Sequence, residues 1–226
     1  MKRYSGCRHL PFASAVWMAL FCGAYWAGSV LFPWEALERA VAALPAGPGE
    51  LVANLLFRWG AAPTALLLVL IATLWRVPSS AMFLEPRSGC ATLSSQLGIG
   101  TLVGIGCAIP VLIGMSIGSE HHVVPTFVPW AMAGNCFSDF YKEFIFRGFL
   151  LGGLIHYDLD RTSALLISAS LSALSHFLAS PLELSGAFII SLLWGIMTLR
   201  CRSLLPAYIA HLCVDMALMQ LRGIII

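Results

Sequence analysis

Long apolar runs separated by short polar segments dominate the pattern of this chain of 226 residues. Most runs come close to the ~20 residues that a helix needs to cross the hydrocarbon core of a bilayer. We therefore expect an all-α, polytopic transmembrane helical bundle with about seven spans, embedded in the lipid bilayer. The expected spans are residues 10–33, 51–75, 97–117, 128–155, 162–179, 184–199 and 204–221.

Composition and charge support this interpretation. Hydrophobic residues make up 59% of the chain and charged residues 11%, which is too apolar for a soluble globular domain. The formal net charge of +2 is too small to indicate a nucleic-acid partner. With a cytoplasmic N-terminus, most Lys and Arg residues fall in cytoplasmic segments, as the positive-inside rule requires. We expect an integral membrane protein, and the short loops favour the bacterial inner (plasma) membrane.

The chain is predicted to have two parts. Residues 1–127 hold the N-terminal transmembrane helices and their connecting segments, and residues 128–226 hold a helical core that carries the candidate chemistry. In the first part, the span at 97–117 is rich in glycine with small-x-x-x-small spacing. Such spacing lets two membrane helices approach closely, so we interpret these glycines as packing residues.

The stretch 141–148 places Lys142, Glu143 and Arg147 inside an apolar segment. Ionisable groups at membrane depth usually face a protein interior or a water-filled cavity, and this stretch is therefore a candidate site. Asp139, Glu143 and Arg147 follow i, i+4, i+8 spacing, which places them on one helix face. A carboxylate beside a guanidinium stays ionised and is able to act as a general base on water.

Later spans add two histidines and another carboxylate. His176 stands alone among Leu, Ala and Ser, and His211 and Asp215 share a helix face at i, i+4. A structural role is the common one for such a histidine, but at membrane depth it needs a partner. If the bundle brings these groups together, Glu143 and His176 polarise a water for attack on an amide, and His211 donates to the developing oxyanion.

The same groups also allow a metal site, because Glu and His are zinc ligands. However, the chain has no H-E-x-x-H motif and no other zinc-specific spacing. We expect no metal cofactor, with zinc as the alternative.

Three segments resemble the signature motifs of the CPBP family of glutamic-type intramembrane proteases. They are residues 143–150, His176, and residues 203–211 together with Asp215. The family is related to the type II CAAX prenyl endopeptidases and the bacteriocin-immunity-type proteins. The resemblance covers residues 128–215.

The resemblance implies a role for each matching residue. Glu143 and Arg147 match the second glutamate and the arginine of E-E-x-x-x-R, and His176 matches the histidine of F-x-x-x-H. His211 and Asp215 match H-x-x-x-N/D. On this basis the five residues are the candidate catalytic set.

Two positions depart from the family pattern. Ser172 replaces a phenylalanine, which is a packing residue. Lys142 replaces the first glutamate, which in the family is thought to activate water with the second-motif histidine. Glu143, or Asp139 one turn earlier, then acts as the base, or the site is inactive. Because Lys142 follows Asp139 by three residues, its ammonium is expected to pair with Asp139 rather than with Glu143.

These observations predict an intramembrane endopeptidase that hydrolyses a membrane-anchored peptide or protein substrate through a water activated by Glu and His. The alternative is a catalytically inactive CPBP-like membrane binding or scaffold protein, in which Glu143 is fully occupied by its neighbours. A transporter is the third class, and it favours internal repeats, of which the sequence has no convincing example.

Overall fold

The computed structural model describes residues 10–30, 43, 61–84, 92–118, 129–176 and 181–222. All regular structure in these ranges is helical, which confirms the predicted all-α class there. The elements are α1 (Leu10–Val30), α4 (Ala61–Leu74), α5 (Leu93–Gly118), α6 (Pro129–Glu143), η2 (Phe144–Gly152), α7 (Gly153–His156), α8 (Arg161–Leu174), α9 (Pro181–Cys201) and α10 (Leu205–Arg222).

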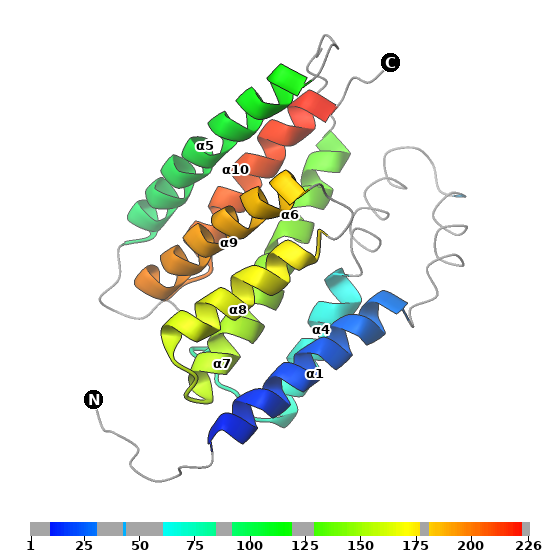
Figure 1. Ribbon diagram of the computed structural model, residues 1–226, viewed down its shortest axis with the longest axis vertical. Helices are drawn as coiled ribbons and strands as arrows, with labels where there is room; N and C mark the ends of the chain where they lie inside the picture. The colour runs from blue at the N-terminus through cyan, green and yellow to red at the C-terminus, as the bar shows by residue number, and fades with distance from the viewer. Residues whose placement is uncertain are drawn as a thin grey trace.

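Successive passes of the chain run in alternate directions along one bundle (Figure 1). The continuous rod α6–η2–α7 counts as one pass, and the start of α1 and the end of α10 lie at opposite ends of the bundle. Two stretches, Leu93–Ile113 and Pro181–Cys201, are long and apolar enough to cross a membrane by length and composition. Shorter apolar helical stretches cover Phe12–Tyr25, Thr64–Leu74 and Leu205–Leu218. The number of spans therefore stays a prediction.

The rod α6–η2–α7 contains a π-helix, η2, in which every residue is buried. π-Helical segments are rare and frequently occur at functional sites. Two backbone carbonyls of η2 accept side-chain hydrogen bonds, Phe149 from the Trp17 indole at 3.0 Å and Phe146 from the Ser168 hydroxyl at 2.8 Å. Just beyond η2, a Cβ on Gly153 would overlap the Trp17 ring. The absence of a side chain there lets α1 lie directly against the rod.

An apolar cluster fills the space between α1, α4 and one side of the rod. At its centre, the rings of Trp17 and Phe149 stack with centroids 4.1 Å apart and planes 18° apart. Leu68 of α4 is likewise fully buried. The remaining buried members include Phe21, Ala65, Phe144, Phe146, Leu150, Leu151 and Leu154.

Helix α5 packs closely on α10 through its glycines. A Cβ at Gly104 would lie 2.7 Å from the Cβ of Cys213 and 2.9 Å from the Cα of Ala210. Gly100 is similarly close to the carbonyl oxygen of Pro206. These contacts agree with the packing role that the sequence predicts for glycines of this span. The position of α10 thus depends on two glycines of α5.

Helix α8 has well-defined ends. The Asp160 side chain accepts a hydrogen bond from the Ser163 backbone N–H at 2.9 Å, which is an N-cap. This hydrogen bonding holds the pKa of the exposed Asp160 carboxyl below its ordinary value of 3.8. At the other end, the helix stops at Leu174 and places His176 in a turn, whereas the predicted span continues to residue 179.

The early end of α8 has a local cause. The His176 backbone N–H bonds to the Ala173 carbonyl three residues earlier, and the Ser175 hydroxyl bonds to the Ser172 carbonyl. Serine side chains of this kind compete with the helical backbone ladder. The last turn therefore tightens and terminates.

Candidate active site

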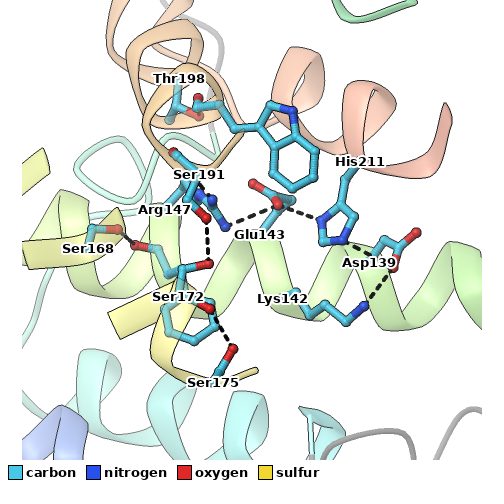
Figure 2. A network of polar contacts seen from close by, with 12 residues as sticks. Asp139, Lys142, Glu143, Arg147, Ser168, Ser172, Ser175, Ser191, Thr198 and His211 are labelled. Carbon is cyan, nitrogen blue, oxygen red and sulfur yellow. Dashed lines mark hydrogen bonds and ion pairs between the residues drawn. The ribbon is translucent and has the colours of Figure 1, made fainter. Parts of the chain in front are cut away.

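Glu143 lies at the C-terminal end of α6 and is completely buried. Its Oε1 atom accepts hydrogen bonds from Arg147 NH1 at 3.2 Å and from His211 Nδ1 at 2.7 Å (Figure 2). Its Oε2 atom has no hydrogen-bond partner within the described part of the chain. The carboxylate is thus fixed through one oxygen, and the other is buried without a partner among the described residues.

Arg147, in the first turn of η2, is the partner that offsets the charge of Glu143. It is only 1% exposed, and the two side chains form an i, i+4 ion pair. The other end of the guanidinium donates to the Ser191 carbonyl on α9 at 3.4 Å and lies 5.5 Å from the centroid of the Trp194 ring. Arg147 therefore connects the rod to α9, and Arg147 is held on three sides.

His211 brings α10 into the site. Because an ionised carboxylate only accepts hydrogen bonds, the 2.7 Å contact to Glu143 assigns a proton to Nδ1. The opposite nitrogen, Nε2, lies 3.7 Å from Asp139 Oδ1 and 3.9 Å from Asp215 Oδ1. The ring also stacks on Trp194 with centroids 4.3 Å apart. Two carboxylates thus face Nε2.

Lys142 pairs with the two aspartates and leaves Glu143 to Arg147 and His211. Its Nζ lies 3.2 Å from Asp139 Oδ1 and 3.5 Å from Asp215 Oδ2. The predicted pairing of Lys142 with Asp139 is confirmed. The charged groups consequently form two adjacent sets. One set is Glu143 with Arg147, the other is Lys142 with the two aspartates, and His211 contacts both.

His176 lies at the margin of this group, in the turn after α8, with an exposed side chain. It is close enough to interact electrostatically with Lys142, Arg147, His211 and Asp215. Direct contacts of 4.0 Å or less join the other predicted site residues, namely Asp139, Lys142, Glu143, Arg147, His211 and Asp215. The buried centre of the arrangement is Glu143.

Residues of α8 and α9 also belong to the site, although the sequence did not single out their roles. The Ser191 hydroxyl donates to the Ser172 hydroxyl at 3.0 Å, which links α9 to α8 (Figure 2). Ser172 is the position where the family pattern has phenylalanine, so a polar bridge replaces apolar packing here. A usable signal was the spacing of Ser191, Trp194 and Thr198, which places three buried polar or aromatic side chains on one helix face.

One group of side chains has the donor set of a cation site. The ligand atoms of Asp139, His211 and Asp215 all lie within 4.8 Å of one another. Two carboxylates and an imidazole are common ligands of divalent metals. Lys142, however, already contacts both carboxylates.

The apolar helices of this bundle bury a carboxylate, a guanidinium and an imidazole together. The class that these features define is a helical protein with a polar internal site. Residues 124–217 match the sequence model of a family described as type II CAAX prenyl endopeptidase Rce1-like. The match covers less than half of the chain and supports a relationship of this segment to the CPBP/CAAX protease-like family, whose members are membrane-embedded CAAX-type proteases. No curated protein and no solved structure matches the chain.

Proposed function

We propose that this protein is an intramembrane endopeptidase of the glutamic type, which hydrolyses a peptide bond of a membrane-anchored peptide or protein. The observation that supports this best is the state of Glu143. Its Oε1 is held by Arg147 and His211, and its buried Oε2 has no partner within the described residues. A fixed, ionised carboxylate with an available oxygen is suited to accept a proton from water.

In the proposed mechanism, Glu143 Oε2 takes a proton from a water whose oxygen attacks the carbonyl carbon, and His176 is the second partner of that water. The tetrahedral oxyanion accepts a hydrogen bond from the His211 ring, whose Nε2 edge faces Asp139 and Asp215. Glu143 then returns the proton to the amide nitrogen as the C–N bond breaks. No metal takes part in these steps.

The test is cleavage by purified variants in detergent or liposomes. We expect Glu143→Gln and His176→Ala each to lower turnover by at least ~10²-fold, the scale of a lost general acid or base, with unchanged helix content. Lys142→Ala should lower it less, because Lys142 does not contact Glu143. Since the family name specifies prenylated CAAX sequences, the substrates are a prenylated CAAX peptide and the same peptide without the lipid.

Two outcomes contradict this mechanism. Full activity of Glu143→Gln would remove the proposed base. Inactivation by a chelator followed by recovery with zinc would replace the glutamic mechanism with a metal-dependent one. Cleavage of only one peptide in the pair would identify whether the substrate needs its lipid.

The second candidate function is a catalytically inactive membrane binding or scaffold protein. Lys142 supports it, because this lysine replaces the first glutamate of the family motif and is bound to Asp139 and Asp215. The decisive variant is Lys142→Glu. If the wild type cleaves neither peptide and Lys142→Glu cleaves one, the natural protein is the inactive relative.

We further propose that the chain lies in a bacterial inner membrane with seven spans and a cytoplasmic N-terminus. The alternating helix directions and the placement of the start of α1 and the end of α10 at opposite ends support an odd number of passes. The bias of Lys and Arg toward segments on the N-terminal side supports the orientation. A topology reporter fused after the last residue should be active outside the cytoplasm; activity inside would refute the orientation or the odd number.

A further inference from the structure

Asp139, His211 and Asp215 form a cluster of potential metal ligands. Lys142 lies where a cation bound to this cluster would lie. Its ammonium is 3.2 Å from an oxygen of Asp139 and 3.5 Å from an oxygen of Asp215. The third group, His211, directs Nε2 toward the same two carboxylates at 3.7 and 3.9 Å. The cluster therefore consists of three potential metal ligands from two helices, with one ammonium between the acidic ones.

A separate observation supports a ligand-binding role for this cluster. Asp139 is completely buried, and its Oδ2 atom has no hydrogen-bond partner within the described part of the chain. A buried carboxylate oxygen without a partner is costly. Of the two oxygens, only Oδ1 contacts Lys142, so the ammonium does not fully satisfy this carboxylate.

We propose that Asp139, His211 and Asp215 form a divalent-cation site, and that Lys142 takes the place of the metal as an internal cation. The ligand atoms, which lie within 4.8 Å of one another, need only small side-chain rotations to reach metal–ligand distances of ~2.0–2.2 Å. A metal and the ammonium compete for the same oxygens. The wild-type site is consequently closed to divalent metals, and loss of the lysine charge opens it.

The physical basis is charge balance. When both are ionised, Asp139 and Asp215 carry two negative charges, and Lys142 offsets one of them within hydrogen-bonding distance. A divalent ion bound beside the ammonium would be repelled by it, and that repulsion is strong in a low-dielectric interior. A neutral side chain at position 142 removes this repulsion.

The experiment measures binding of Co²⁺ alone to purified protein in detergent, through the visible absorption of the bound ion. Lys142→Met keeps the length of the side chain and removes its charge. It should bind one Co²⁺ per chain, tighter than the wild type by about a hundredfold, or ~2.8 kcal/mol at ~1.4 kcal/mol per factor of ten. Zn²⁺ should displace the Co²⁺. Lys142→Arg, which retains the charge, should behave like the wild type.

Two further variants in the Lys142→Met background identify the ligands. Asp139→Asn should abolish Co²⁺ binding, whereas Asp160→Asn, at an exposed carboxylate that caps α8, should leave it unchanged. Lys142→Ala provides a second neutral variant if Lys142→Met does not fold. A folded neutral variant that binds no Co²⁺, or a wild type that binds it equally tightly, would overturn the proposal. These measurements do not depend on whether the protein cleaves peptides.

Discussion

Different kinds of interaction stabilise the two sides of the rod α6–η2–α7. One side packs Phe149 and its apolar neighbours against α1 and α4, centred on Trp17. The other side presents Glu143 and Arg147 to α9 and α10. Packing on the first side is a sum of many weak contacts, whereas the second side depends on a few strong pairs. The apolar side should therefore tolerate shape-conserving changes that the polar side does not.

The largest effect on stability is expected when one buried charge is removed. Arg147→Met should lower the free energy of unfolding by about 3–5 kcal/mol, because it leaves the completely buried Glu143 carboxylate without its ion-pair partner. The measurement is denaturant-induced unfolding in detergent, followed by helix content. Leu150→Met, at an equally buried position on the apolar side, should cost less than ~1.5 kcal/mol.

The double variant Glu143→Gln/Arg147→Met sharpens the comparison. Removal of both charges should recover most of the stability that Arg147→Met loses, because no unpaired charge remains. If Arg147→Met and Leu150→Met cost the same, the two sides of the rod do not differ as described.

An intermediate effect is expected at the α5–α10 contact. Gly104→Ala should cost ~1–3 kcal/mol, because the new Cβ would lie 2.7 Å from Cys213 and must push α10 away. It should also lower activity, since α10 carries His211 and Asp215. The checks are the unfolding free energy and the cleavage rate.

Gly106 provides the matched control on the same helix. A Cβ there meets nothing within 4 Å, so Gly106→Ala should be neutral or stabilising by up to ~1 kcal/mol through its higher helix propensity. Equal effects of the two alanines would mean that close packing of α5 does not position α10.

The smallest effect is expected at the N-cap of α8, away from both sides of the rod. Asp160→Ala should lower the melting temperature slightly, and Asp160→Asn, which retains a capping oxygen without the charge, should lower it less. Because the pKa of Asp160 is lowered in the folded state from 3.8, the stabilisation by its charge is complete above that value. It is lost as the pH falls further through the folded pKa.

The melting difference between wild type and Asp160→Ala should thus shrink between pH 6 and pH 3. A difference that stays constant over this range would mean that the capping bond does not depend on the ionised carboxylate. Neither variant should alter cleavage, because Asp160 is exposed and lies outside the polar cluster.

The sequence predicted much of the fold because long apolar runs leave the backbone few alternatives to helix. It also predicted the Lys142–Asp139 and Glu143–Arg147 pairs, since i, i+3 and i, i+4 spacing brings such side chains together on any helix. The contact of His211 with Glu143 joins residues 68 apart in the chain, and only the resemblance to known motifs indicated it.

Other features could not be read from the hydrophobic pattern. The π-helix depends on tertiary contacts such as the Trp17–Phe149 and Ser168–Phe146 hydrogen bonds. The end of α8 before His176 depends on Ser175, whose hydroxyl donates to the Ser172 carbonyl. Hydrophobic periodicity reports which face of a helix is apolar, and it does not report where a ladder of hydrogen bonds changes its spacing.

The π-helix η2 also gives the rod some tolerance to changes in length. In an ordinary α-helix, deletion of one residue rotates everything beyond it by ~100°, which would turn Gly153 away from Trp17 while Glu143 stayed in place. Because a π-helical turn contains one residue more than an α-helical turn, a deletion within η2 can be absorbed by a change to α-helical bonding. Relatives that differ by one residue in this rod are therefore expected to differ within η2, with the site and the apolar core still facing their own partners.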